Sequence, residues 1–362
     1  MLTEDGCRAR RARLWDALAG RVNVPALVLS DPLHLCYLAN FYVDPFSLGA
    51  DFGGLLVLRP DGHATLYHDK RLPASVQAAY VDRREVIPWY DGQSAGLGAR
   101  RLALRPAVEA NGGRIHDSLA DAVGPLVIET ISELRQAKVA DEVDLLHACM
   151  RATEAGHAWA RSNIQAGMTE LDVYLGVFSA CSRAAGHAAI VYGDFAVSPG
   201  PARRGGPPTN HLLADGDMFI LDYSVILSGY RSDFTNTLVV GKKPTPNQQR
   251  LFDACMAAMT AGEATLRAGA TCQSVYDAVR GALEKAGLAD AFPHHAGHGL
   301  GLSHPEAPFI VRHSSESLVN GAVVTLEPGV YVDGIGGVRI EHNYLITPTG
   351  YERLSNHTIS LT

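Results

Sequence analysis

The chain lacks the features that mark secreted, membrane-spanning and nucleic-acid-binding proteins. Its six cysteines are widely spaced and form no Cys-x-x-Cys pair, so we expect reduced thiols in a cytoplasmic protein rather than disulfides or structural zinc. No uninterrupted apolar run is long enough to cross a bilayer, and the polar first residues lack the apolar core of a secretory signal. With 31 Lys and Arg against 38 Asp and Glu, the chain also lacks the positive charge that attracts nucleic acid or an anionic membrane. We therefore expect neither as a partner.

Composition and length predict a globular protein of two domains. Apolar residues make up 47% of the chain and charged residues 19%, which is typical of a folded protein. A chain of 362 residues exceeds one ordinary hydrophobic core. The first part alternates short helical and strand-like segments, and residues 134–138 then lead into a long amphipathic helix at 141–163. We place the boundary at residue 130, which gives domains 1–130 and 131–362.

The second domain contains an internal repeat of paired helices. The second helix of each pair has a threonine as its predicted N-cap and a glycine at its end: Thr169 and Gly186, then Thr271 and Gly287. The two glycines are 101 residues apart. A duplicated unit of two helices and a strand predicts a pseudo-two-fold α/β domain, in which the helices cover one face of a curved sheet and leave the other face free for a site.

Four short segments in this domain carry single acidic or imidazole side chains. Asp222 ends an apolar run, and Asp233 precedes a stretch of β-formers, so we expect the two to lie on neighbouring strands of one hairpin. His298 stands between two glycines, which allow close approach of the backbone. Glu327 ends a strand before a Pro-Gly turn. Residues 337–345 alternate like one strand and end the series with Glu341.

Each of these segments alone is weak evidence, because a lone acid on a strand is usually ion-paired or solvated. Their joint occurrence in this order carries the prediction. Four carboxylates and one imidazole suit two divalent cations of the manganese, cobalt or zinc type. Two such cations a few Å apart can share a bridging hydroxide, which is a common means of hydrolysing an amide at neutral pH.

The same segments resemble the metal-site motifs of the pita-bread metallopeptidases, a group that includes methionine aminopeptidase, aminopeptidase P and prolidase. The matching motifs are Leu-Asp-Tyr-Ser at 221–224, Gly-Tyr-Arg-Ser-Asp at 229–233, Gly-His-Gly at 297–299, Leu-Glu-Pro-Gly at 326–329 and Gly-Val-Arg-Ile-Glu at 337–341. They are most similar to the Xaa-Pro peptidase branch. The resemblance implies an α/β (α+β) fold, with a small creatinase/prolidase-like N-terminal domain and a C-terminal pita-bread domain. It also implies a homodimer and short proline-containing peptides as substrates.

The resemblance assigns a role to each matching residue. Asp222 would bind one metal, Asp233 and Glu341 would bridge both, and His298 and Glu327 would complete the other. The implied cofactor is two divalent cations, with manganese first and cobalt or zinc as alternatives. Glu327 would also act as general base toward the bridging hydroxide.

Three further residues match positions near the substrate in relatives: His294, His304 and Arg339. His304 comes one residue earlier than the proton-shuttling histidine of relatives, and we expect a bulge to aim it at the site. Arg339 would orient Glu341 or hold the substrate carboxylate. Relatives also carry a substrate histidine where this chain has Gly205, which leaves His211 or Arg204 to replace it.

Other functions remain open at this stage. The branch alone does not separate a prolidase, which cleaves dipeptides, from an aminopeptidase P, which accepts longer peptides. A metal-free creatinase-like hydrolase is disfavoured because such relatives lose several of the five ligands. A methionine aminopeptidase fits the ligands but needs no large N-terminal domain. A non-catalytic pita-bread module that binds peptides is the remaining alternative, and metal content would separate it from the enzyme.

Overall fold

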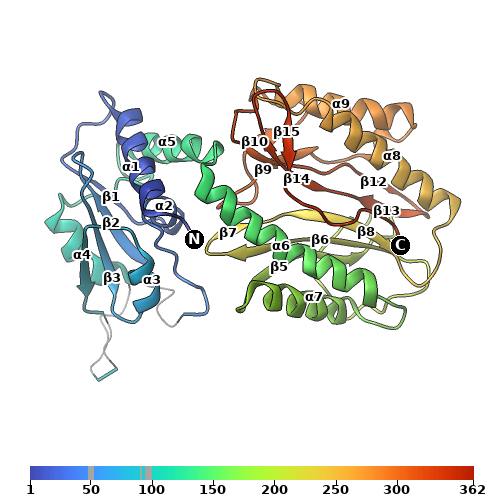
Figure 1. Cartoon of the computed structure of the whole chain (residues 1–362), viewed down its shortest axis with the longest axis horizontal. Helices are drawn as coiled ribbons and strands as arrows, with labels where there is room; N and C mark the ends of the chain where they lie inside the picture. Colours follow the sequence, from blue (N-terminus) through green and yellow to red (C-terminus); the bar gives the residue numbers. More distant parts are fainter. Residues whose placement is uncertain (48–52, 90–91, 94–99) are drawn as a thin grey trace. The chain divides into compact units, whose positions relative to one another are not determined.

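A computed structural model describes residues 1–47, 53–89, 92–93 and 100–362. The chain divides into two compact units, Met1–Arg135 and Gln136–Thr362, which are coloured blue to teal and green to red in Figure 1. Among the described residues, no helix combines the length and apolarity that a bilayer crossing requires.

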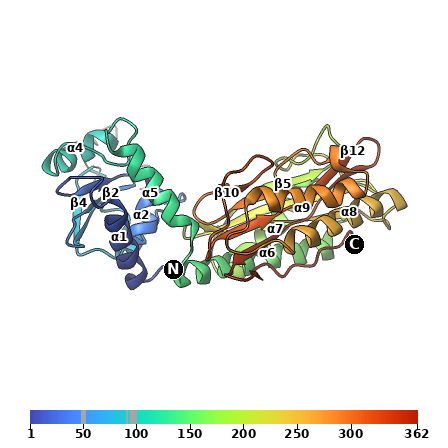
Figure 2. The same cartoon turned by 90° about the horizontal axis from the view of Figure 1, so that it is seen from above.

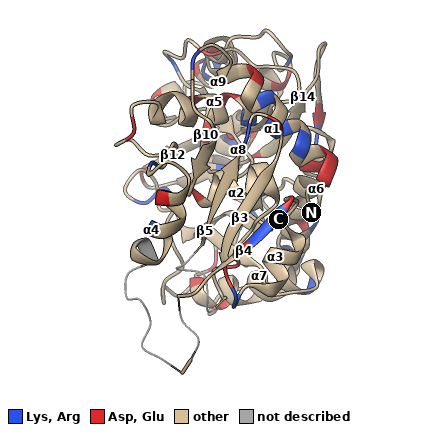
Figure 3. Cartoon of the chain, turned by 90° about the vertical axis from the view of Figure 1, so that its left-hand side faces the viewer, with Lys and Arg blue, Asp and Glu red and all other residues tan. Residues whose placement is uncertain are grey.

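The first unit is an α/β domain built on one mixed sheet. Its four described strands lie in the order β1 (Leu27–Leu29), β2 (Gly54–Leu58), β3 (Ala64–Asp69) and β4 (Arg83–Ile87). Neighbours are antiparallel except β3 and β4, which run parallel. The helices that accompany the sheet are α1 (Glu4–Leu18), α2 (Pro32–Ala39), α3 (Pro73–Ala78), α4 (Arg100–Ala110) and α5 (Gly124–Gln136). Figure 3 shows acidic and basic residues interspersed along these elements.

The second unit begins with two helices and an antiparallel sheet. The elements are α6 (Ala140–Asn163), α7 (Glu170–Ala185), β5 (Ile190–Val197), β6 (Met218–Leu227), β7 (Tyr230–Arg231) and β8 (Phe234–Val239). The central strand β6 pairs with β5 on one side and with β7 and β8 on the other. Helix α6 packs on β6 and β7, and α7 packs on β5.

The second half of this unit repeats the plan of two helices followed by strands. It contains α8 (Pro246–Glu263), α9 (Cys272–Lys285), the short helix η1 (Ala289–Ala291), β9 (Gly297–Gly299), β10 (Glu306–Ile310), β11 (Val323–Leu326), β12 (Gly329–Val332), β13 (Gly336–Arg339), β14 (His342–Ile346) and β15 (Tyr351–Arg353). The sheet order is β10-β9-β11-β14-β15, and β12 pairs with β13. Figure 2 shows α6 to α9 gathered on one side of the strands, which is the arrangement of the pita-bread fold.

The capping residues predicted for the helix repeat are confirmed. The side chains of Thr169 and Thr271 accept hydrogen bonds from the backbone of α7 and α9 respectively. Gly186 ends α7 in the left-handed conformation, with φ of 78°. Gly287 has φ of 69° and directly follows Ala286, which is the C-cap residue of α9. Both positions favour glycine because other residues are strained at positive φ.

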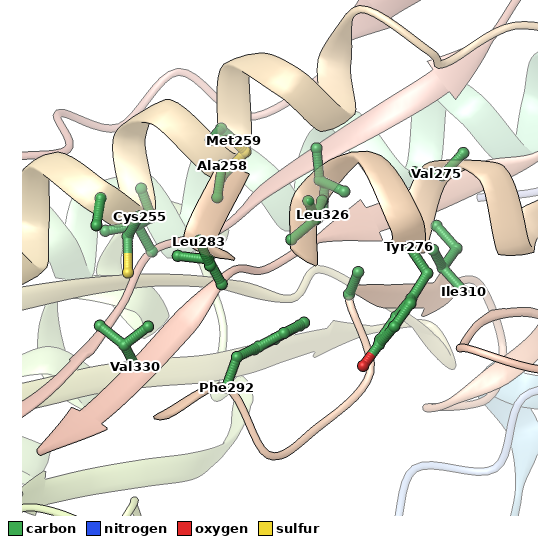
Figure 4. Close-up of a cluster of buried hydrophobic side chains, with 14 of the residues drawn as sticks. Cys255, Ala258, Met259, Val275, Tyr276, Leu283, Phe292, Ile310, Leu326 and Val330 are labelled. Carbon is green, nitrogen blue, oxygen red and sulfur yellow. The ribbon is translucent and has the colours of Figure 1, made fainter. Parts of the chain in front are cut away.

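A buried apolar cluster fixes the backbone on both sides of Glu327. Leu326 and Val330 are fully buried in it, together with Cys255 and Met259 of α8, and Figure 4 shows these side chains beneath the helices. Truncating a buried leucine of this kind costs about 2–5 kcal/mol. The packing therefore holds the turn that carries Glu327 in one position.

One prediction about the strands is wrong. Residues 337–345 form two strands rather than one, because β13 pairs with β12 whereas β14 pairs with β11. The chain changes partners at Ile340 and Glu341, whose backbone N–H groups donate to Pro328 and Thr235 respectively. This crossing between two sheets is what turns Glu341 inward.

Candidate metal centre

The two aspartates come from the hairpin of β6 and β8. Asp222 lies in the middle of β6, opposite Thr235 of β8 and Asp194 of β5. Asp233 lies between β7 and β8, where its backbone N–H donates to Asn343 Oδ1 at 3.2 Å. The predicted hairpin is therefore present, and it places both carboxylates on the same side of the sheet.

His298 sits on β9, between two close neighbouring strands. A Cβ added at Gly297 would lie 2.1 Å from the Thr325 carbonyl oxygen, and one at Gly299 would lie 2.1 Å from that of Ala307. Both glycines are thus required for the strands to approach. The His298 Nε2 atom lies 3.4 Å from Glu327 Oε1 and 3.5 Å from an Asp233 oxygen, so the imidazole faces the acids.

Glu341 is the most electrostatically strained member of the group. Its Oε2 accepts a hydrogen bond from Thr235 at 2.7 Å, whereas its Oε1 is buried without a hydrogen-bond partner among the described residues. Burial, reinforced by repulsion from Asp233, Glu327 and Asp222, raises the pKa of Glu341 well above its usual value. A buried anionic oxygen left unpaired among other acids is costly unless a cation compensates it.

The neighbouring groups show the same competition between burial and charge. Burial raises the pKa of Asp222 to about 6, although Arg339 opposes the shift. Burial also disfavours ionisation of Asp233 and Glu327, but nearby histidines outweigh it: His304 and His298 lower the pKa of Asp233, and His295 leads in lowering that of Glu327 to about 2.

The five predicted ligands form two overlapping donor groups. One oxygen each of Asp222, Asp233 and Glu341 lie within 4.8 Å of one another, and so do donor atoms of His298, Glu327 and Glu341. Glu341 belongs to both groups, as a ligand shared by two ions must. The donors are oxygens with one imidazole nitrogen, which suits manganese, cobalt or zinc. The residues therefore fit two divalent cations.

Two further donor groups border these: Asp233 with His298 and His304, and Glu327 with His294 and His295. His304 Nε2 lies 2.7 Å from an Asp233 oxygen, so the histidine that comes one residue early does reach the site. The pairing of β9 with β10 shifts register between Glu306 and Phe309, just after it. The expected irregularity is thus present.

His294 and Arg339 meet at Tyr331. The Tyr331 hydroxyl lies 3.3 Å from His294 Nε2 and accepts a hydrogen bond from Arg339 Nη1 at 2.8 Å. Burial lowers the pKa of His294 to about 4, which keeps the ring neutral at pH 7. Arg339 also pairs with Asp194 and Asp222 rather than with Glu341, one of the two partners that the sequence suggested.

Of the eight site residues predicted from the sequence, all except Glu341 line one cavity of about 340 Å³. Several other residues that line the cavity were not predicted from the sequence: Tyr192, Asp194, Ser224, His295, Pro305 and Tyr331. Asp194 could have been found by pairing β5 with β6, because this places it opposite Asp222. His295 could have been found from the histidine-rich segment in which it lies. Of the two proposed substitutes for the missing histidine, Arg204 lines the cavity and His211 is exposed outside it.

Comparison with known proteins agrees with this geometry. Residues 144–348 match the model of metallopeptidase family M24. The chain is 30% identical to the probable dipeptidase PepE of Mycobacterium bovis, over 96% of this chain and 94% of that one. The crystal structure of dipeptidase PepE from Mycobacterium ulcerans is 28% identical, with a TM-score of 0.77 and coverage of 99% and 98%. An Xaa-Pro dipeptidase structure from Bacillus anthracis, at 22% identity, has a TM-score of 0.79 and coverage of 98% and 99%. The chain belongs to metallopeptidase family M24.

Proposed function

We propose that this metallopeptidase hydrolyses Xaa-Pro bonds in dipeptides or short peptides with two divalent cations. The observation that carries the proposal is the position of Glu341, whose carboxylate is common to two donor groups and has one unpaired buried oxygen. The names of the relatives, dipeptidase and Xaa-Pro dipeptidase, support the substrate class. In this proposal the catalytic domain is the segment 131–362.

The proposed division of the ligands is the one that the family resemblance implies, and the donor groups support it for Glu341, which is common to both. Asp222 would hold one ion, His298 and Glu327 the other, and Asp233 and Glu341 both. Manganese is the proposed metal, with cobalt and zinc as alternatives. Such a pair of ions supplies a water-derived nucleophile at neutral pH and polarises the carbonyl of the bond to be cleaved.

The remaining chemistry belongs to the protein. The lowered pKa of Glu327 keeps its carboxylate ionised and able to take a proton from the attacking water. His304 faces the same cavity, in a position to deliver a proton to the departing proline nitrogen. His294 lines the cavity and is held between the His295 carbonyl and the Tyr331 hydroxyl, where its neutral ring would position the substrate. Arg339 orients Asp222.

The proposal is tested by hydrolysis of Ala-Pro and Ala-Pro-Ala, each with and without manganese. We expect manganese-dependent release of alanine. A prolidase cleaves only the dipeptide, whereas an aminopeptidase P also cleaves the tripeptide. If the protein binds two manganese ions but cleaves neither peptide, the Xaa-Pro assignment is wrong. If it binds peptide but no metal, the alternative of a non-catalytic binding module is favoured instead.

Two predictions about the protein's setting stay proposals. All six cysteines are buried and none forms a disulfide, which supports a reducing, cytoplasmic environment. The homodimer implied by the family resemblance is checked by light scattering coupled to size-exclusion chromatography.

A further inference from the structure

Two consecutive arginines in the loop after β5 differ in what they contact. Arg203 forms a two-pronged ion pair with Glu170, with nitrogen–oxygen distances of 2.6 and 2.8 Å. Glu170 is fully buried, so Arg203 has a structural role. Arg204 is exposed to solvent and lines the metal-site cavity.

The backbone of this loop is fastened to the wall of the cavity. The Arg204 carbonyl accepts a hydrogen bond from Arg339 Nη1 at 3.2 Å. The Gly206 N–H donates to Asp194 Oδ1 at 2.8 Å, and the Gly206 carbonyl accepts from Phe195. A Cβ at Gly205 would lie 1.9 Å from Asp194 Oδ2. A side chain at 205 would therefore displace Asp194 from its pairing with Arg339, whereas the adjacent Arg204 lines the cavity without such a conflict.

The charges around the cavity leave one arginine available. Arg339 is committed, because its guanidinium pairs with both Asp194 and Asp222 and donates to Tyr331. The guanidinium of Arg204 has no hydrogen-bond or ion-pair partner among the residues that the structure describes. An arginine that lines a substrate cavity and whose guanidinium has no carboxylate of its own is suited to bind one from the ligand, because its planar fork matches carboxylate geometry.

We propose that Arg204 binds the C-terminal carboxylate of the substrate and thereby selects dipeptides. This inference rests on the proposed peptidase function. In an Xaa-Pro dipeptide the carboxylate is on the residue directly after the cleaved bond, whereas in a longer peptide that position carries a neutral amide. A cavity of about 340 Å³ is near the lower end of the range for ligand sites, which also suits a dipeptide.

The test compares Ala-Pro with its C-terminal amide, using the manganese-loaded protein. The two ligands differ only in the carboxylate, so the ratio of their kcat/KM values measures its recognition. We expect the wild-type protein to prefer the acid by at least about tenfold, the scale of one hydrogen-bonded charge pair. Arg204→Ala should lose most of this preference through a higher KM for Ala-Pro. Arg204→Lys should retain part of it, because a lysine keeps the charge without the fork.

Control variants separate a specific effect from a general one. Arg151 is exposed on α6 and lies outside the cavity, so Arg151→Ala should keep the wild-type ratio. Melting temperature and manganese stoichiometry show whether Arg204→Ala is folded, and if it is not, Arg204→Gln takes its place.

The outcomes distinguish this inference from the function on which it rests. If wild type and Arg204→Ala cleave both ligands with the same acid-to-amide ratio, Arg204 does not bind the carboxylate, although the Xaa-Pro peptidase function stands. If the manganese-loaded wild-type protein cleaves neither ligand, both proposals fail. If Arg204→Ala loses the preference for Ala-Pro over its amide and Arg204→Lys regains part of that preference, the inference is supported.

Discussion

Arg339 Nη2 lies 2.6 Å from Asp222 Oδ2 within the metal-site cavity. Burial, reinforced by the neighbouring carboxylates, raises the pKa of Asp222, and Arg339 opposes this shift. The arginine therefore keeps a carboxylate ionised that a metal must find in its anionic form. Arg339 lies on β13, which belongs to a different sheet from β6. Its ion pair therefore fixes the direction of the Asp222 carboxylate from outside the strand that carries it.

Arg339→Ala is expected to weaken metal binding without removing any ligand. Loss of a group that orients a metal ligand typically costs about 10–100-fold in affinity, and we expect the same here, measured by competition with a chelator. Asp194 also loses its partner in this variant, so Arg339→Met, which keeps more of the packing, is the companion variant. Manganese affinity equal to that of the wild type in both variants would show that Asp222 needs no such support.

Glu341→Gln is expected to abolish metal-dependent activity and to stabilise the metal-free protein. Burial, reinforced by repulsion from three other acids, raises the pKa of Glu341 well above its usual value, so above pH 4.5 this residue destabilises the metal-free fold relative to the unfolded chain. A glutamine removes that charge, can still accept the hydrogen bond from Thr235, and can donate to the neighbouring carboxylates. Relief of a buried uncompensated charge is worth about 1–4 kcal/mol.

Thermal unfolding with and without manganese checks both parts of this prediction. Manganese should raise the melting temperature of the wild type but not that of the variant. The stabilisation of the metal-free variant should shrink as the pH falls toward 4.5, because the unfolded wild-type chain then also binds a proton at Glu341 and the difference between the two states disappears. If the metal-free variant is less stable than the metal-free wild type at pH 7, then the burial of Glu341 among other acids does not destabilise the wild-type fold.

The sequence singled out five candidate ligands that the structure brings together, because each lies in a short motif with a recognisable strand or turn beside it. It could not predict the direction of Glu341, since a local alternation pattern does not show that Ile340 leaves one sheet and Glu341 joins another. Asp194 and Tyr331 were missed for a related reason. Each is an ordinary strand residue by pattern, and only the pairing of distant strands brings it to the cavity.

His304→Ala is expected to lower kcat by about 100-fold, the usual scale for loss of a proton-transferring group, with manganese content unchanged. The imidazole faces the cavity and lies 2.7 Å from Asp233. The same distance permits a second role, since His304 groups with Asp233 and His298 as a set of metal donors. Metal analysis of the variant decides between them: two bound ions support proton transfer, and the loss of one makes His304 a ligand. An unchanged kcat would assign it neither role.

A cluster of three buried histidines, His157, His342 and His357, should make the stability of the metal-loaded protein fall in acid. The ring of His357 lies 4.7 Å from that of His157 and 4.8 Å from that of His342. Burial lowers the pKa of all three, to about 4 for His357 and about 2 for His342. Arg161 and Arg353 add to the effect on His357.

The sign of the effect follows from where the protons bind. Below the pKa of an unfolded histidine, about 6.5, the unfolded chain takes up protons that the folded cluster resists. The free energy of unfolding therefore falls as the pH drops from about 6.5 toward 4, by up to about 1.4 kcal/mol per pH unit for each histidine. His357→Gln keeps a donor for the Thr235 carbonyl and removes one titrating group, so its slope should be smaller by about that amount. His313→Gln, at an exposed position, should leave the slope as it is. Denaturant unfolding between pH 4 and 7 measures all three proteins, and equal slopes for wild type and His357→Gln would mean that His357 is not held neutral in the fold.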